Sequence, residues 1–297
     1  MNEVRIIGVS RASKFSPNCE NNDSGIFNAV SHELYLKGFA VSEISETDIS
    51  ELSTSEADLY FSMARDTRAL EVLRSKESAG TIIVNSPSSL LFYSRSNITK
   101  AFIANGIPLP LSEVLHENDI PSLPYPFWLK RGEACAQSRN DVVFVENADD
   151  LYLALKNFKE RGISNIVVNE HLVGDLVKFY GVVGTNFFYT YYPTENGKFG
   201  KFGLEQINGK VHHYAFNRDK LQEVCNCAGK LLGFTVYGGD CVVDENGDFK
   251  IIDFNDWPSF SCCRGKAANV IANVLQSLAR KRNGYLNFKD NWRNEHD

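Results

Sequence analysis

The sequence predicts an α/β protein whose first part is an open α/β sheet and whose last part carries an acidic β-hairpin. Strand-like and helix-like segments alternate over residues 1–92, as in an open sheet flanked by helices. Near the C-terminus, two apolar runs flank Asn246-Gly247, a pair typical of hairpin turns. Between these parts, the three prolines of Ile120–Pro126 predict a linker that separates two lobes.

The first part contains short apolar runs and amphipathic stretches separated by turn residues. We expect strands over Val4–Val9, Phe39–Ile44, Asp58–Met63 and Thr81–Asn85, and helices over Asp23–Lys37 and Thr67–Lys76. A long polar loop, Ser10–Asn22, follows the first strand, and ligands of open α/β sheets bind beyond the carboxyl ends of strands. The candidate substrate contacts there are Arg11, Lys14, Asn18 and Asp23. A flexible loop with no ligand is the alternative.

The rest of the chain continues with helices and strands of ordinary length. The expected helices are Asn97–Asn105, Asp149–Phe158, Lys220–Leu232 and Lys266–Arg280, and the expected strands are Phe127–Lys130, Ile166–Asn169, Leu176–Val183 and Phe187–Tyr192. No internal repeat and no low-complexity segment interrupts them.

The composition excludes several classes of protein. Apolar residues make up 43% and charged residues 23% of the 297-residue chain, as in globular proteins. The net charge of −6 argues against nucleic acid or an anionic membrane as the main partner. No apolar run is long enough to span a membrane, and the N-terminus is expected to be a strand rather than a signal peptide. The seven cysteines lack zinc-site spacing, which indicates reduced thiols in a cytoplasmic protein.

The acidic hairpin is the most informative segment. If Asn246 and Gly247 form a two-residue turn, Asp240 lies directly opposite Asp253, and Asn255 shares a face with Asp253. Side chains in such a pair have Cβ atoms about 4.5–5.5 Å apart, so the two carboxylates repel one another. A bound cation resolves this conflict, and oxygen-only ligands suit a hard ion such as Mg²⁺. The alternative is a solvent-facing hairpin with incidental acidic residues.

Four separated features now occur in a recognisable order. They are Arg95 before Gly106-Ile107-Pro108, then Phe127–Lys130, then Asn169–Asp175, then Asp240 with Asp253-Phe254-Asn255 and Pro258. Together they resemble the ATP-grasp superfamily over nearly the whole chain. The resemblance implies an α/β fold with α+β lobes: an N-terminal pre-ATP-grasp open α/β domain over 1–92, a small lobe over 93–168, and a C-terminal lobe with the metal site over 169–297.

The resemblance also implies where ATP binds. Arg95 would contact the phosphates, and Lys130 the α-phosphate and adenine. The loop Gly132–Asn140 would cover the phosphates. The hinge that pairs with the adenine edge would be Glu170, His171, Leu172 and Val173, and Asp175 would hold the ribose hydroxyls.

For the metal and the chemistry, the resemblance implies further roles. The metal ligands would be Asp240, Asp253 and Asn255, and Lys178 falls where some members carry a cation for the phosphate or acyl intermediate. Gly238 occupies the position where many ligases carry an arginine for the acyl-phosphate. Arg218 and Arg264 are the candidates to replace that arginine.

The leading functional hypothesis is a carboxylate–amine (or thiol) ligase that uses ATP and Mg²⁺, with Mn²⁺ as the alternative ion. It resembles the ribosomal-protein-modifying and glutathione synthetase branch, so its expected partners are ATP and a small-molecule or peptide carboxylate. One alternative is a small-molecule kinase, because Leu176–Tyr180 and Asp253-Phe254-Asn255 also resemble inositol-phosphate kinases. A non-catalytic nucleotide sensor is the third hypothesis. The chain contains neither a P-loop nor a dinucleotide-binding glycine motif.

Overall fold

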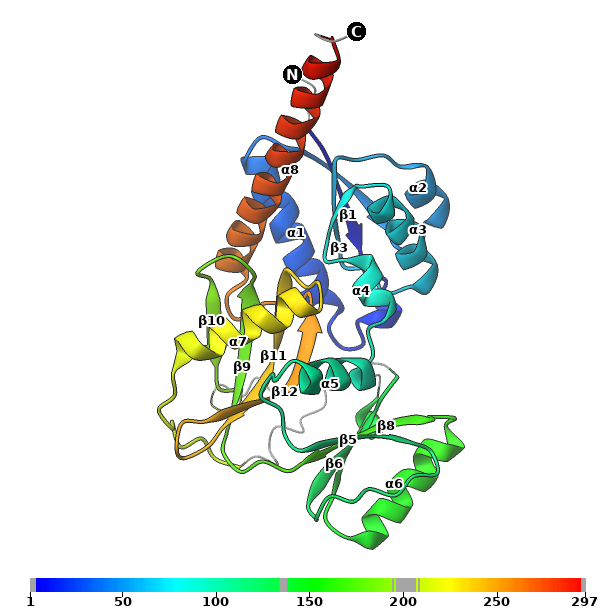
Figure 1. Cartoon of the computed structure of the whole chain (residues 1–297), viewed down its shortest axis with the longest axis vertical. Coiled ribbons are helices and arrows are strands. Elements are labelled where there is room, and N and C mark those ends of the chain that lie inside the picture. Colours follow the sequence, from blue (N-terminus) through cyan, green and yellow to red (C-terminus); the bar gives the residue numbers. More distant parts are fainter. Residues whose placement is uncertain (1–3, 134–137, 194, 196–206, 208, 295–297) are drawn as a thin grey trace.

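The computed structural model describes residues 4–133, 138–193, 195, 207 and 209–294, with side chains described as far as residue 280. The described residues form three four-stranded sheets, stacked along the long axis of the molecule with their helices around them (Figure 1). The predicted α/β fold class is confirmed.

The N-terminal sheet is parallel, with strand order β2-β1-β3-β4. Its elements are β1 (Arg5–Ser10), α1 (Glu20–Leu36), β2 (Ala40–Ser45), α2 (Ile49–Thr54), β3 (Leu59–Ser62), α3 (Thr67–Ser78) and β4 (Ile82–Val84), with a short 3-10 helix at Ser13–Phe15. Alternation along the strands sends Ile7 and Tyr60 into the core with α2 and α3, whereas Ile6 and Leu59 pack on the α1 side. The predicted open α/β sheet is confirmed, although the sequence analysis missed α2, the 3-10 helix and the short helix Pro87–Leu91 that follows β4.

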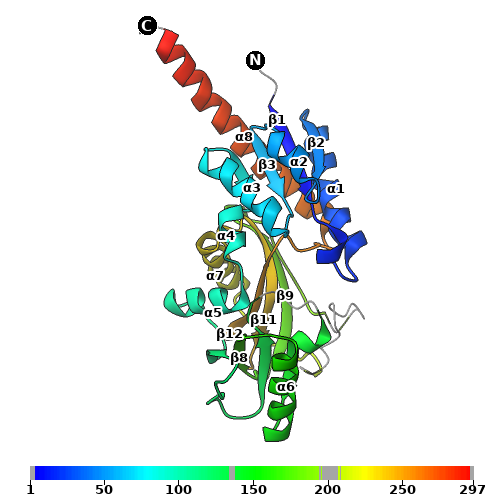
Figure 2. The same ribbon diagram turned by 90° about the vertical axis from the view of Figure 1, so that its right-hand side faces the viewer.

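The last helix, α8 (Arg264–Asn294), returns to this first sheet. Ala267, Ile271 and Leu275 share a buried core with Ile26 and Val30 of α1. Helix α8 lies beside α1 and runs on past it toward the C-terminal end of the chain (Figures 1 and 2). The segment that follows the C-terminal hairpin thus packs on the N-terminal domain, which brings residues distant in sequence to one end of the molecule.

The second sheet is antiparallel, with strand order β5-β8-β6-β7. The elements of this region are α4 (Pro87–Leu91), α5 (Arg95–Ala104), β5 (Ser112–His116), β6 (Phe127–Arg131), a 3-10 helix (Arg139–Asp141), β7 (Val142–Val145), α6 (Ala148–Glu160) and β8 (Asn165–Glu170). Phe127 and Leu129 of β6 pack with Phe158 of α6, so the alternating Trp128 and Lys130 face the other way. Ile120–Pro126 connects β5 to β6 within this one sheet, so its prediction as a linker between lobes was wrong.

The third sheet is also antiparallel, with strand order β10-β9-β11-β12. Its elements are β9 (Asp175–Val182), β10 (Phe188–Tyr191), α7 (Arg218–Leu231), β11 (Val236–Val243) and β12 (Phe249–Asp256). Val177 and Phe179 of β9 are buried with Leu221 and Cys225 of α7. Helix α7 therefore covers one face, and the opposite face carries Lys178, Asp240 and Asp253.

The turn between β11 and β12 differs from the prediction. Val243 pairs with Phe249, and the N–H of Asp244 donates to the carbonyl of Asp248 at 2.9 Å, which leaves a three-residue loop. Gly247 ends that loop with φ +81°, a conformation that favours glycine. A β-bulge next to Asp240 then shifts the register by one residue, so Asp240 does lie opposite Asp253. The pairing is confirmed, although the two-residue turn from which it was deduced was wrong.

The described residues include neither a candidate membrane span nor a disulfide. Within the described part of the chain, no helix is long and apolar enough to cross a bilayer. The six described cysteines are free thiols, as expected, and Cys135 lies outside the described residues.

Candidate active site

A large cleft opens where the three sheets meet. It encloses about 1570 Å³, more than the roughly 300–1,000 Å³ typical of a site for one drug-sized ligand. Its lining includes Arg11 from the N-terminal domain, Lys130 from the second sheet and Asp240 from the third. The cleft has room for a nucleotide and a second substrate.

A row of charged and polar side chains crosses the cleft face of the third sheet. Directly paired positions place Tyr191, Lys178, Asp240 and Asp253 side by side on β10, β9, β11 and β12. All four line the cleft, because directly opposed residues of neighbouring strands share a face. The Lys178 Nζ lies 2.9 Å from one Asp240 carboxylate oxygen and 3.1 Å from the other. One fixed cation therefore offsets part of the repulsion between the two facing carboxylates.

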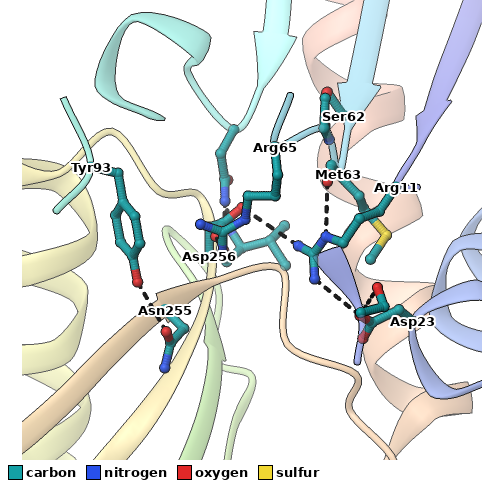
Figure 3. A network of polar contacts seen from close by, with 12 residues as sticks. Arg11, Asp23, Ser62, Met63, Arg65, Tyr93, Asn255 and Asp256 are labelled. Carbon is teal, nitrogen blue, oxygen red and sulfur yellow. Dashed lines mark hydrogen bonds and ion pairs between the residues drawn. The ribbon is translucent and has the colours of Figure 1, made fainter. Parts of the chain in front are cut away.

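Asn255 extends this row at the end of β12. Its amide Nδ2 donates to the Asp253 carboxylate at 2.9 Å, and its Oδ1 accepts a 2.9 Å hydrogen bond from the hydroxyl of Tyr93 (Figure 3). The Tyr93 hydroxyl also lies 3.1 Å from the carbonyl oxygen of Phe254. Tyr93 thus fixes the orientation of the Asn255 amide beside the acidic pair.

The donor set of Asp240, Asp253 and Asn255 fits a hard divalent cation. It offers two carboxylates and an amide, all of which can bind through oxygen. No group of three or more His, Cys, Asp or Glu side chains able to hold a metal occurs among the described residues. A cation here would need further oxygens from phosphate or water, which is how Mg²⁺ is usually bound, whereas zinc prefers nitrogen and sulfur ligands.

Two cations face the acidic pair from the second sheet and α5. Lys130 is 8% exposed, and its Nζ donates to the carbonyl of Ile252 at 3.1 Å, next to Asp253. Burial and the nearby Arg95 guanidinium lower the pKa of Lys130 to about 8, against the opposing effect of Asp253 and Asp240. Arg95 lies in the same cleft and donates to the carbonyl of Arg131 at 2.7 Å.

Only two of the four predicted hinge residues line the cleft. Glu170 and Leu172 line it, but the Glu170 carboxylate already accepts from Lys250 Nζ at 2.6 Å and from the Leu111 N–H at 2.8 Å. Burial raises the pKa of Glu170, yet these donors hold it below its usual value. Any nucleotide contact by this segment would therefore come mainly from the backbone.

The other two hinge residues have different surroundings. His171 Nδ1 lies 3.2 Å from the indole Nε1 of Trp128, and burial lowers the pKa of His171, which favours the neutral ring that can accept this bond. The side chain of Val173 is 84% exposed, and it does not belong to the residues that line the cleft. The structure thus gives no side-chain role in the cleft to either residue.

Asp175 and Arg218 also lie outside the lining of the cleft. The Asp175 side chain is fully buried, and its oxygens accept the backbone N–H groups of His212 at 2.6 Å and Tyr214 at 2.8 Å. This saturated carboxylate has a structural role, which corrects its assignment to the ribose. Arg218 begins α7 with its guanidinium 5.5 Å from the ring centre of Phe188. Arg218 is not among the residues that line the cleft.

Gly238 stands where many ligases carry an arginine, and Arg264 is the other candidate to replace that arginine. A Cβ atom at Gly238 would lie 2.7 Å from Pro258 Cγ and 2.8 Å from Tyr180 Cδ1, so packing excludes a side chain there. Arg264 does line the cleft, where its Nη2 donates to Asn22 Oδ1 at 3.1 Å. In this chain, the cation paired with Asp240 is Lys178 instead.

The polar loop after β1 reaches the cleft, as its position beyond a parallel strand suggested. Arg11, Lys14 and Asn18 of this loop line the cleft, together with Asp23 in the first turn of α1. Sequence reasoning missed Arg65, although it follows β3 at the same edge of the sheet, and the same rule could have found it. No sequence signal pointed to Tyr93. Residues 134–137 of the predicted phosphate-covering loop Gly132–Asn140 lie outside the described residues.

Solved structures with the same fold match more than nine tenths of the chain. D-alanine–D-alanine ligase from Bacillus anthracis, complexed with ATP, is 15% identical, with 96% of this chain and 100% of that chain covered and a TM-score of 0.66. A RimK-domain ATP-grasp protein from Sphaerobacter thermophilus is 15% identical over 91% and 99% of the two chains, with a TM-score of 0.64. The ATP-grasp ligase PsnB, complexed with a minimal precursor, is 14% identical over 94% and 100%, with a TM-score of 0.62. No family model and no curated protein sequence matches the chain.

Proposed function

The chain has the ATP-grasp fold, and on this basis we propose that it is an ATP-dependent ligase that joins a carboxylate to an amine or a thiol through an acyl-phosphate. The observation that carries this proposal is the row of Lys178, Asp240 and Asp253, with Lys130 facing it across the cleft. Such an arrangement of cations around paired carboxylates suits a metal-bound polyphosphate more than a neutral ligand.

The nucleotide would lie between the second and third sheets. Lys130 and Arg95 supply fixed positive charge for its phosphates, as a point charge and a planar fork respectively. The backbone around Glu170 and Leu172 would meet the adenine edge. Lys130 enters the complex protonated at neutral pH, because its pKa of about 8 is raised further by a phosphate group.

Asp240, Asp253 and Asn255 would hold Mg²⁺, or Mn²⁺ in its place. The ion would neutralise the phosphate charge that otherwise repels an incoming carboxylate. Tyr93 keeps the Asn255 amide in place, and Lys178 keeps Asp240 from turning away from the row. These contacts fix the ligands before the nucleotide arrives, which reduces the cost of ordering them during the reaction.

In the reaction, a carboxylate oxygen of the substrate would attack the γ-phosphorus, and the bond to the β–γ bridging oxygen would break. ADP leaves with that electron pair. The amine then attacks the acyl carbon, phosphate leaves, and the amine proton passes to solvent. Packing leaves no room for an arginine at Gly238. Lys178, which lies beside Asp240, would therefore stabilise the charge on the transferred phosphoryl group instead.

The experiment follows the products of ATP. The purified protein is incubated with ATP, Mg²⁺ and a pool of carboxylates and amines, while ADP and inorganic phosphate are measured together. A ligase releases both in equal amounts, and only when an acid and a nucleophile are present. Absence of ATP binding, or phosphate release that no substrate stimulates, would contradict the proposal.

A small-molecule kinase is the second candidate, and the Gly238 position favours it. Without an arginine at this position, the cleft offers less charge to an acyl-phosphate than many ligases do. A kinase would form ADP and a phosphorylated product without free phosphate, so the same assay distinguishes the two activities. ATP binding without turnover in a broad pool would indicate a nucleotide sensor instead.

A further inference from the structure

A chain of buried charges lies along the N-terminal side of the cleft. The Arg11 Nη1 lies 3.1 Å from the Asp23 carboxylate, and its Nη2 lies 3.9 Å from that of Asp256. Arg65 forms an ion pair with the other oxygen of Asp256. Figure 3 shows this network extending from Asn255 at one end to Asp23 at the other. Arg264 adjoins the Asp23 end through its hydrogen bond to Asn22.

The loops that carry Arg11 and Arg65 are joined by hydrogen bonds to one carboxylate. The buried Glu46 carboxylate accepts the backbone N–H groups of Ala12 at 2.5 Å, Arg65 at 2.6 Å and Asp66 at 2.5 Å, which ties the loops after β1 and β3 together. The Arg65 guanidinium lies 4.9 Å from the ring centre of Tyr93. Because these contacts exist in the protein alone, a ligand would find the loops already ordered.

Arg264 differs from the other two arginines. Arg11 and Arg65 have the carboxylates of Asp23 and Asp256 as partners, but no ion pair of Arg264 is found among the described residues. Its Nε is buried and has no hydrogen-bond partner in that part of the chain. A Cβ atom at Gly25 would lie 2.7 Å from Arg264 Cζ, so the guanidinium packs directly on the α1 backbone. A buried donor without a partner costs about 1–3 kcal/mol. Arg11 Nη2 also lacks a hydrogen-bond partner in the described structure, so it is the lack of an ion pair there that sets Arg264 apart.

We propose that Arg264 binds a carboxylate that does not react, carried by one of the two molecules that the enzyme joins. This inference rests on the proposed ligase function. Arg264 lies in the same cleft as the acidic row, but its hydrogen bond to Asn22 places it next to Asp23 rather than next to Asn255. A carboxylate at Arg264 is therefore separate from the one that meets the γ-phosphate. The substrates then carry at least two carboxylates between them, as with a dicarboxylic acid or an amino acid acceptor.

The local charge favours a carboxylate over a phosphate monoester. Arg264 is the single guanidinium of the cluster without a carboxylate partner in the described structure, and Glu46 adds a further negative charge next to Arg65. Asp23, Asp256 and Glu46 together equal the three arginines in charge, so a dianionic phosphate would add more excess negative charge in this partly buried place than a monoanionic carboxylate would. The planar fork of arginine suits the two oxygens of a carboxylate.

The test measures binding of simple dicarboxylates to the full chain loaded with Mg²⁺ and a non-hydrolysable ATP analogue. Malonate, succinate, glutarate and adipate are each compared with their monoamides by calorimetry. The proposal expects at least one acid to bind about tenfold more tightly than its monoamide. Arg264→Met should abolish this preference, and Arg264→Lys should retain part of it.

Arg264→Met is expected to fold, because it leaves no carboxylate without its partner. Arg74→Met, which removes an exposed arginine from α3 outside the cleft, is the matched control and should keep the preference. The proposal is overturned if no acid in the series is preferred over its monoamide, or if Arg264→Met keeps the preference. Affinity for the ATP analogue is measured separately, so a failure of the nucleotide site is recognised as a failure of the proposed function.

Discussion

The two sides of the cleft hold their charged groups in different ways. On the third sheet, strand pairing alone places Lys178, Asp240 and Asp253 in a row. On the N-terminal side, Arg65 and Asp256 meet only through side chains whose residues are 191 positions apart in the sequence. The backbone positions the first group, whereas side-chain contacts between distant segments position the second.

This difference predicts different consequences of substitution. Changing a carboxylate of the row removes chemistry, because the strands still pair without it. Changing a member of the arginine network removes a contact between the N-terminal domain and the end of β12, and leaves a charge uncompensated. The first kind of variant should therefore lose turnover at nearly constant stability, and the second should lose stability.

The largest expected effect is on turnover in Asp253→Asn. The change keeps the size and hydrogen bonding of the side chain but removes one of the two carboxylates that would hold the metal. We expect turnover to fall by about 10³-fold or more, since metal stabilisation of phosphoryl charge contributes several kcal/mol. Steady-state ADP formation measures this loss, and urea denaturation should show a stability within about 1 kcal/mol of the parent.

Asp248→Asn is the control for that variant. Asp248 is exposed in the turn of the same hairpin and does not line the cleft, so its turnover should match the parent. If Asp253→Asn retains parental turnover, the metal assignment is wrong.

The largest stability effect is expected for Asp256→Ala. Asp256 is 2% exposed and faces both Arg65 and Arg11, whose side chains are 20% and 9% exposed. Its removal leaves two partly buried guanidinium groups short of a carboxylate, at a cost of about 3 kcal/mol in the free energy of unfolding. Urea denaturation measures this value.

The comparison variant is Glu56→Ala. Glu56 pairs with Arg5 at 3.9 Å with both side chains mostly exposed, so its loss should cost less than about 1 kcal/mol. Equal effects of the two substitutions would show that the network on the N-terminal side contributes no more than a surface ion pair.

The same contrast explains how far the sequence could be interpreted. The Asp240–Asp253 pair follows from alternation along two strands and a turn signal, and it survived an error in the turn because a bulge shifts the register back. The parallel sheet and its cleft-facing loop likewise follow from local patterns. Tertiary packing brings Arg65, Tyr93 and Asp256 together, and no local sequence pattern predicts such contacts. Asp175 shows the converse error, since a position in a motif does not reveal which way a side chain faces.

A smaller effect concerns the pH dependence of nucleotide binding by Lys130. Its pKa of about 8 lies below the usual 10.5, so the unfolded chain binds more protons than the native protein between these values. This group therefore makes the free energy of unfolding rise with pH across that window. Affinity for an ATP analogue should instead be constant below pH 8 and fall above it, by up to about tenfold per pH unit.

Above pH 8, affinity for the analogue should fall while the contribution of Lys130 to the free energy of unfolding rises. A loss of affinity can therefore be distinguished from a loss of the fold. Calorimetric titration of the analogue and urea denaturation are each measured from pH 6.5 to about 9.5 around the pKa of Lys130. In Lys130→Met, affinity should be low throughout, with no inflection near pH 8. An inflection that persists in this variant would assign the titration to another group.

The smallest effect is expected where the two sides of the cleft meet, at Tyr93. Its ring stacks with Arg65, and its hydroxyl donates to Asn255. Tyr93→Phe keeps the ring, and therefore the stacking, but releases the Asn255 amide. We expect the Mg²⁺ concentration for half-maximal turnover to rise about fivefold, which corresponds to about 1 kcal/mol for one hydrogen bond. Mn²⁺ binding followed by electron paramagnetic resonance should weaken to the same extent, whereas Tyr125→Phe, on an exposed side chain, should change neither value. If Tyr93→Phe lowers stability while Mn²⁺ binding is unchanged, Tyr93 belongs with the arginine network rather than with the acidic row.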